Sequence, residues 1–341
     1  MDLTTHYLGM VLRNPLVASA SPMSVHVDGV RALADAGIGA VVLFSLFEEE
    51  VHREQLRDLH LTETHEHAYG EALSYFPTVP TSEPGAAHRY LRHIERCVAA
   101  VDVPVIASLN GSTPGGWVRF AKAMEDAGAA AIELNIYAVP GDPHTSGRDV
   151  EDRHEEILRA VKESVTVPVA VKLSPHFSSV GEVALRLDKA GADGLVLFNR
   201  FLHPDVDAET LTVEPGVTLS VPHEARLPRA WIAILHGHIT GSLAATTGVE
   251  SADDVAAYLL AGADVVMTAS SLLRHGVGHV KTLLEDLEEW MWRKEFDKLE
   301  DVRGRLAVPH GADATAYERA GYVAALERGR TQYGGLAGTP S

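Results

Sequence analysis

Four segments of the chain share one pattern, in which an amphipathic stretch ends at a glycine and a continuous apolar run follows. The four glycines are Gly37, Gly128, Gly191 and Gly262. Glycine tolerates the left-handed backbone conformation that commonly closes a helix at its C-terminus. Continuous apolar runs are typical of strands that are buried on both faces of a parallel sheet. The pattern therefore predicts helices that are followed directly by buried parallel strands.

Three further apolar runs begin at or near a proline, in the sequences NPLVASAS, VDVPVIASLN and VTVPVAVKLS. Proline is tolerated at the start of a strand, where its missing N–H is least harmful. With a shorter run, LAATTGV, the sequence predicts eight strands, at residues 15–20, 40–44, 104–109, 130–135, 168–173, 194–199, 243–247 and 264–268. Helical periodicity separates most of these strands.

Eight alternating strand and helix units predict a closed (β/α)8 TIM barrel of the α/β class. An open, doubly wound sheet would give a similar pattern over any three units. The number of units, and the lack of a candidate for an added antiparallel edge strand, favour the barrel.

Two connections between the predicted strands are long, at residues 45–103 and 200–242. Active sites of such barrels are built from loops at the carboxyl ends of the strands, so these extended loops after the second and sixth strands are candidate lids. In the later one, PRAWIAILHGH predicts the sixth helix, with Pro228 in its first turn. We expect residues 1–295 to form the barrel, and residues 296–341 to form a C-terminal helical extension with a flexible tail.

Composition narrows the range of partners. Of the 341 residues, 46% are hydrophobic and 22% are charged, and the net charge is −18. Such a surface repels nucleic acid backbones and anionic lipid. Cys97 is the single cysteine, which excludes an internal disulfide and a cysteine-based metal cluster. The sequence has no signal-peptide pattern and no apolar run of membrane-spanning length, so we expect a cytoplasmic protein.

Polar side chains gather at the carboxyl ends of the predicted strands, where barrels of this kind place their active sites. They are Ser19, Ser21, Ser45, Asn110, Asn135, Lys172, Asn199, Thr246, Thr247, Thr268 and Ser270. Hydroxyl and amide groups both donate and accept hydrogen bonds, as a flavin or another heteroaromatic ring requires.

Lys172 is the clearest candidate for chemistry, because it is one of seven lysines and ends the fifth predicted strand. A lysine at this place points into a partly buried site, where its charge needs an anionic partner. It can stabilise the negative charge of a reduced flavin ring. Covalent Schiff-base chemistry and a surface position just past the strand end are the alternatives.

Two short polar segments follow the last two predicted strands. They are Thr246, Thr247 and Gly248 after the seventh strand, and Ala269, Ser270 and Ser271 after the eighth. Loops at these two places frequently bind phosphate through backbone N–H groups and a helix N-terminus. Ordinary helix N-caps would explain each segment alone, but their occurrence as a pair favours a phosphate site.

The histidines carry less information. His60, His65 and His67 lie close together, but their spacing matches no metal motif, so we expect no metal and interpret this stretch as part of an acidic lid. His203, in the sixth connection, is a candidate acid or base.

With the strands placed, the motifs NPLVASAS, VVLFSLF, VIASLNG, IELNIY, VAVKLSP, LVLFNR, ATTGV and VMTASSLL follow the order and spacing of the dihydroorotate dehydrogenase family. The chain resembles this family over roughly residues 1–295. It is most similar to the group of dihydroorotate dehydrogenase-like proteins, through SASPMS, EALSYFP, LNGSTPGGW, LFNRF and RLPRAWIAIL. The resemblance implies a barrel that binds FMN, an oxidoreductase activity on CH–CH bonds, and a link to pyrimidine biosynthesis.

The resemblance also implies roles for individual residues. Lys172 matches the family lysine beside the flavin ring, and Asn135 and Asn199 match asparagines that contact flavin or orotate. Ser19, Ala20 and Ser21 match the flavin-contacting segment after the first strand. The segments 246–248 and 269–271 match the cradle for the flavin phosphate.

Three positions depart from the family's pattern. Ala138 occupies the position of the usual cysteine or serine base, Phe44 that of a second lysine, and the orotate pocket is poorly reproduced around Ser74 and Tyr75. Alanine cannot accept a proton. We therefore expect flavin binding to be retained, and dihydroorotate to be oxidised poorly or not at all.

The remaining polar candidates concern the substrate. Tyr137 and His203 are candidates for proton transfer, and Arg200 and Arg226 are candidates to hold a carboxylate in bidentate pairs. We expect a planar or unsaturated carboxylate as substrate, a homodimer, and a redox partner protein. One alternative is a flavin-binding electron-transfer or scaffold subunit that oxidises no small molecule itself. Another is a phosphate-handling lyase or isomerase that uses Lys172 covalently.

Overall fold

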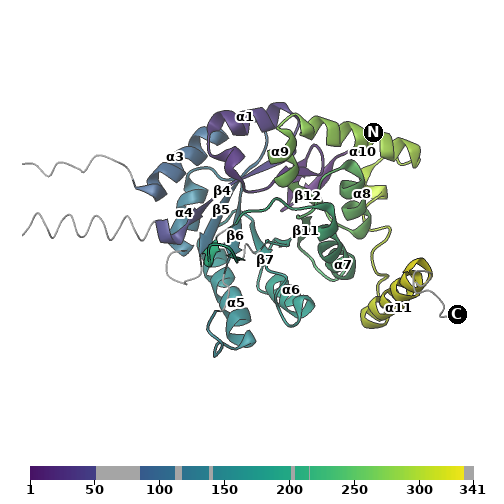
Figure 1. Ribbon diagram of the computed structural model, residues 1–341. Helices are drawn as coiled ribbons and strands as arrows, with labels where there is room; N and C mark the ends of the chain where they lie inside the picture. The colour runs from purple at the N-terminus through teal and green to yellow at the C-terminus, as the bar shows by residue number, and fades with distance from the viewer. Residues whose placement is uncertain (51–84, 112–116, 138–140, 201–203, 215, 334–341) are drawn as a thin grey trace, which may run out of the picture.

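Eight parallel strands close into a barrel, as the sequence predicts (Figure 1). The computed structural model describes residues 1–50, 85–111, 117–137, 141–200, 204–214 and 216–333. The barrel strands are β3 (Leu16–Ala18), β4 (Ala40–Phe47), β5 (Val105–Gly111), β6 (Ala131–Ile136), β7 (Val169–Leu173), β8 (Gly194–Leu197), β11 (Ser242–Ala245) and β12 (Val265–Thr268). Strand β12 pairs with β3 and closes the barrel. All eight predicted strands are confirmed, and the open sheet is excluded.

Helices surround the barrel and bury its outer face. They are α1 (Val27–Asp35), α3 (Ala86–Val98), α4 (Trp117–Asp126), α5 (Gly147–Ser164), α6 (Val180–Lys189), α7 (Arg226–Leu235), α8 (Ala252–Ala261), α9 (Ser270–His275) and α10 (His279–Arg293). Pro228 lies in the first turn of α7, as predicted. The four glycines of the repeated pattern have φ values of +94° to +118°, which confirms their predicted left-handed conformation.

An N-terminal hairpin closes the lower end of the barrel, where the strands begin. It consists of β1 (Thr5–Tyr7) and β2 (Met10–Leu12). Tyr7, Leu8 and Leu12 form one buried cluster with small inward-facing residues of the strands, which include Ala40, Ala131, Ala170 and Ala244. The backbone N–H of Leu8 donates to Ser242 Oγ over 3.0 Å. Gly194, which begins β8, leaves space for this hairpin, because a Cβ there would lie 2.7 Å from Leu8 Cδ2.

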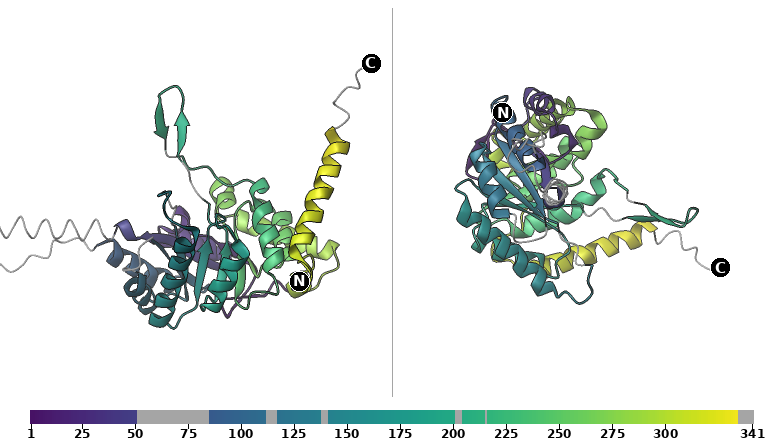
Figure 2. Two further views of the ribbon diagram at one scale, coloured as in Figure 1. Left: turned by 90° about the horizontal axis from the view of Figure 1, so that it is seen from below. Right: turned by 90° about the vertical axis from the view of Figure 1, so that its left-hand side faces the viewer.

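The sixth connection contains a second hairpin that the sequence did not reveal. Its strands are β9 (Asp205–Asp207) and β10 (Thr212–Glu214), and the hairpin projects from the barrel (Figure 2). A 3-10 turn, η2 (Pro222–Ala225), then leads into α7.

The chain beyond α10 first packs on the barrel and then leaves it. Leu299, Val302 and Val308 are buried against the rest of the core. Helix α11 (Ala314–Tyr333) then extends away from the barrel (Figure 2). The division at residue 295 stays a prediction. Among the helices that the structure describes, none is both long and apolar enough to cross a membrane.

The N-terminal hairpin offers a direct test of this packing. Leu12 is 1% exposed and its neighbour Val11 is 64% exposed. Leu12→Ala should lower the free energy of unfolding by about 2–5 kcal/mol, because it leaves a cavity in the barrel interior. Val11→Ala should change it by less than about 0.5 kcal/mol. Urea unfolding measures both, and equal effects would show that the hairpin does not fill the barrel.

Candidate active site

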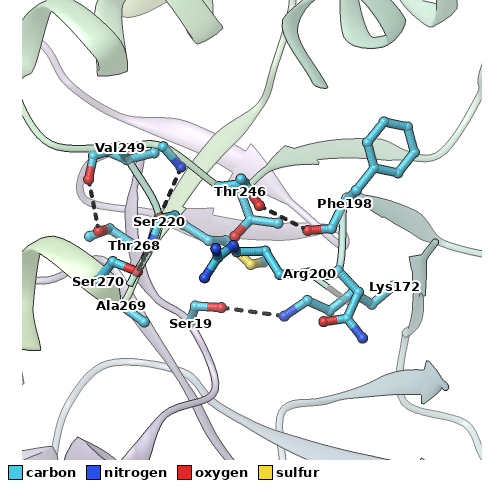
Figure 3. A pocket seen from close by; sticks show the side chains of 14 residues that line it. Ser19, Lys172, Phe198, Arg200, Ser220, Thr246, Val249, Thr268, Ala269 and Ser270 are labelled. Atoms are coloured by element: carbon cyan, nitrogen blue, oxygen red, sulfur yellow. Dashed lines mark hydrogen bonds between the residues drawn. The ribbon is translucent and has the colours of Figure 1, made fainter. Parts of the chain in front are cut away.

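A cavity opens at the carboxyl ends of the barrel strands (Figure 3). It is lined by Ser19, Lys172, Phe198, Asn199, Arg200, Ser220, Thr246, Thr247, Gly248, Val249, Met267, Thr268, Ala269 and Ser270. About half of the sequence-predicted candidates therefore line one cavity, and they come from five strand ends. Parallel strands in a closed barrel all end at the same rim, which is why residues so distant in sequence meet there.

Lys172 lies at the floor of this cavity and is 7% exposed. Its side chain extends toward β3, where Nζ donates to Ser19 Oγ over 3.4 Å (Figure 3). Lys172 Nζ also lies 3.6 Å from Glu133 Oε1, on the adjacent strand β6. The structure thus holds a nearly buried cation against a polar cavity, as the sequence predicted, and excludes a surface position for this lysine.

Amide and hydroxyl side chains on β4, β5 and β6 and just past β8 lie close to one another, and two pairs of them are hydrogen-bonded. Asn199 Nδ2 donates to Asn135 Oδ1 over 2.8 Å. The hydroxyls of Ser45 and Ser108 are 2.8 Å apart. Asn110, which is buried, pairs in register with Asn135. These contacts fix the orientation of side chains beside the cavity, although only Asn199 among them lines it.

The two predicted phosphate segments face each other across a serine that sequence reasoning missed. Gly248 N donates to Ser220 Oγ over 3.2 Å, and Ser220 N donates to Ser270 Oγ over 3.0 Å. Ser271 is fully buried, with its hydroxyl 2.8 Å from that of Thr268. Ser220 lies in an irregular stretch of the sixth connection, so no periodic signal marked it.

A buried tyrosine, which no sequence pattern marked, holds the loop after β11. Tyr258 on α8 places its hydroxyl 3.1 Å from the carbonyl oxygen of Thr246 and 2.6 Å from that of Thr247. Thr247 has a φ of +82°, an uncommon value for a residue other than glycine. Burial raises the pKa of Tyr258, so the hydroxyl keeps its proton and can donate to these carbonyls.

A second cavity adjoins the first and shares Phe198, Asn199, Arg200 and Thr247 with it. Its other lining residues include His176, His223 and Arg226. Arg200 pairs with Glu224, with 3.0 Å between Nη2 and Oε1, and it also donates to the carbonyl of Thr218. Both arginines proposed for carboxylate binding thus line one cavity beside the buried lysine.

Several predicted residues lie outside the cavity or outside the described residues. Ser21 caps the short turn η1 (Pro22–Ser24), and its carbonyl accepts from Ser24 Oγ. Ala20 is half-buried beside it, and Tyr137 is half-buried just past β6. Three candidate positions lie in undescribed stretches: Ala138, His203 and the segment with Ser74 and Tyr75. In the described part of the chain, no cluster of three or more His, Cys, Asp or Glu side chains could hold a metal ion.

The arrangement suits a ligand with a planar polar ring and a phosphate. A ring over the strand ends would meet Lys172, Ser19 and Asn199, while a phosphate would meet N–H and hydroxyl groups of the segments after β11 and β12. Gly248 N and Ser270 Oγ both form hydrogen bonds with Ser220, so both groups point toward the same place beside the cavity.

Comparison with known proteins places this site in context. The family model for dihydroorotate dehydrogenase matches residues 82–291. The catalytic subunit of dihydroorotate dehydrogenase B (NAD(+)) from Halalkalibacterium halodurans is 31% identical over 213 residues, 61% of this chain and 69% of that protein. Its counterpart from Thermoplasma acidophilum is 26% identical over 310 residues, which cover 89% of this chain and 98% of that protein. The NAD-dependent dihydropyrimidine dehydrogenase subunit PreA of Escherichia coli is 25% identical over 319 residues, which cover 89% of this chain and 76% of that protein.

Gly248 tests whether the loop after β11 needs its present shape. A Cβ at Gly248 would lie 2.8 Å from both Ala225 N and Val221 O, and its φ is +70°. Gly9 has a similar φ of +73°, and a Cβ there would meet nothing within 4 Å. Gly9→Ala should lower the free energy of unfolding by about 1–2 kcal/mol from backbone strain alone. Gly248→Ala should lower the free energy of unfolding by about 1–3 kcal/mol more, because backbone atoms must move. Equal costs in urea unfolding would contradict this account of the loop.

Proposed function

We propose, since this chain belongs to the dihydroorotate dehydrogenase family of oxidoreductases that act on CH–CH bonds, that its rim cavity binds FMN and that an unsaturated carboxylate binds beside it. The observation that carries the proposal is the nearly buried Lys172 cation at the floor of a cavity whose far side presents N–H and hydroxyl donors. FMN, when bound, supplies a hydride donor or acceptor.

The residues present fit such a cofactor. The segments Thr246–Gly248 and Ala269–Ser271 would hold the phosphate. Ser19, Ala20, Ser21, Ser45, Asn110, Asn135 and Asn199 would surround the ring and fix its edges. Lys172 would face the ring and stabilise negative charge on it, and this effect is strong because water is largely excluded there.

The second cavity supports an anionic substrate. Arg226 is exposed on the first turn of α7, and Arg200 lies between the two cavities. Two arginines and two histidines line this cavity against one carboxylate, that of Glu224, which pairs with Arg200. In a protein of net charge −18, this local excess of basic groups favours a carboxylate ligand. We place the carboxylate of a planar or unsaturated substrate here, with its reacting carbons toward Asn135 and Asn199.

The residue that moves the proton differs from the family's usual one. Ala138 stands at the position of the family base and has no group that accepts a proton. Tyr137 is the first candidate to transfer the proton, and His203 is the second. A phenol carries its proton at neutral pH. Tyr137 therefore favours the reduction of an activated C=C bond over the oxidation of a C–C bond.

A second candidate function also rests on the lack of a base at Ala138. A chain without the family base suits a flavin-binding subunit that passes electrons to, or scaffolds, a partner protein. Two of the relatives are named as catalytic subunits and a third as subunit PreA. We therefore include a redox partner protein in the proposal.

Purified protein should carry non-covalent FMN, about one per chain, and Lys172 should be needed to hold it. Lys172→Met should weaken FMN binding about tenfold or more, because a charged contact contributes about 1.5–3 kcal/mol. The matched control is Lys162→Met, since Lys162 pairs with Asp193 on the outside of the barrel. Flavin released by denaturation measures the content, and fluorescence titration measures the affinity. Colourless protein that FMN cannot reconstitute would sink the proposal.

Dihydroorotate should reduce the bound flavin poorly in the wild type. A positioned base contributes roughly a hundredfold to ten-thousandfold to such a step, and Ala138 provides none. Ala138→Cys should raise the rate of flavin reduction, measured anaerobically by loss of flavin absorbance. Tyr137→Phe is the parallel test with activated alkenes, whose reduction it should slow. Reduction of the wild type by dihydroorotate at about 1 per second or faster would contradict the role given to Ala138.

A further inference from the structure

A second ionisable group lies inside the barrel, next to the proposed cofactor lysine. Glu133 is in the middle of β6 and is 1% exposed. Side chains alternate along a strand, so Glu133 faces inward together with Ala131 and Asn135. Ala131 belongs to the buried cluster around the N-terminal hairpin. Glu133 thus lies between this apolar filling of the barrel and the polar rim.

The contacts of this carboxylate are few. Among the residues that the structure describes, neither oxygen of Glu133 has a hydrogen-bond partner. Its ion pair is with Lys172, at 3.6 Å between Oε1 and Nζ. A buried carboxylate is costly unless it is paired, and a buried ion pair adds little net stability compared with apolar side chains of the same size. Stability therefore does not explain a glutamate at this position, whereas its place beneath Lys172 does.

We propose that Glu133 is a positioning residue that sets the reduction potential of the flavin through Lys172. This inference rests on the proposed function, since it takes the ring to lie against the Lys172 ammonium. The carboxylate fixes the ammonium at the cavity floor from one side, while Ser19 Oγ accepts its hydrogen bond from β3. It also offsets part of the positive charge that the ring experiences.

The sign of the effect follows from the order of the charges. In the proposed arrangement the Lys172 ammonium would lie between the Glu133 carboxylate and the ring, so the anion would weaken the field that favours electrons on the ring. Glu133→Gln keeps the size of the side chain and removes its charge. The Lys172 cation then acts unopposed, and the reduced flavin becomes more stable relative to the oxidised one.

The midpoint potential of the FMN-loaded protein tests this directly. Glu133→Gln should shift the equilibrium toward reduced flavin about tenfold, which is about 30 mV upward for a two-electron couple. The matched control is Glu151→Gln, because Glu151 is also buried and paired, with Arg148 and Arg186, but on α5 outside the barrel. The control should leave the potential unchanged. A potential that is unchanged or lowered in Glu133→Gln, with flavin still bound, overturns the inference.

A double-mutant cycle separates this inference from the proposed function, because it needs no flavin. Lys172→Met leaves the Glu133 carboxylate buried without its partner. The urea midpoint of this variant should therefore fall below that of the wild type. Adding Glu133→Gln removes the unpaired charge, so the double variant should unfold at a higher urea concentration than Lys172→Met alone. Glu133→Gln should therefore be more favourable in the Lys172→Met background than in the wild type. Equal effects in the two backgrounds would show that the two groups are not coupled, and that also overturns the inference. Coupling in a protein that binds no FMN would instead reject the proposed function and the potential-setting role with it, and would leave only the positioning of Lys172 by Glu133.

Discussion

A closed barrel of eight parallel strands must fill its interior with side chains, and this chain divides the task between its strands and its N-terminal hairpin. The strands contribute small residues at the lower end, where Tyr7, Leu8 and Leu12 enter. Gly194 shows how tight the fit is, since even a methyl group there would meet Leu8. Because the hairpin supplies the bulk, the upper part of the barrel is free to carry polar groups.

The interior of the barrel changes from apolar to polar toward the rim. Apolar packing ends near the middle of β6, where Glu133 begins the polar part, and Lys172 and Asn135 follow toward the rim. These side chains are nearly buried, so each charge acts more strongly on its neighbours than it would in water. The surface carries a large negative charge, but the rim presents Lys172, Arg200 and Arg226 around its two cavities. The site is locally cationic because these lining side chains carry positive charge, although the net charge of the whole protein is negative.

The sequence was most informative where the signal is local. Glycine after a helix and proline before a strand are local requirements of the backbone, so seven of the eight barrel strands could be predicted from them, and the strand in LAATTGV from its short apolar run. The hairpin β1–β2 could not, because its strands have three residues each and depend on the barrel for burial. Ser220 and Tyr258 were missed for a related reason, since their contacts with the β11 loop exist only after the chain has folded. Glu133 was visible as a lone acid in the apolar run AAIELN, which is itself a signal of a paired buried charge.

In the proposed function, cofactor binding and substrate oxidation depend on different parts of the rim. The groups assigned to the flavin come mainly from the ends of β3, β7, β11 and β12, where the cavity and its donors are intact. By the resemblance to the family, its base would belong to the loop after β6, at the position of Ala138. In the described part of the chain, no residue from that loop lines the cavity. A barrel can in this way keep its redox cofactor while its substrate chemistry changes, since each loop is attached to a separate strand of a rigid frame.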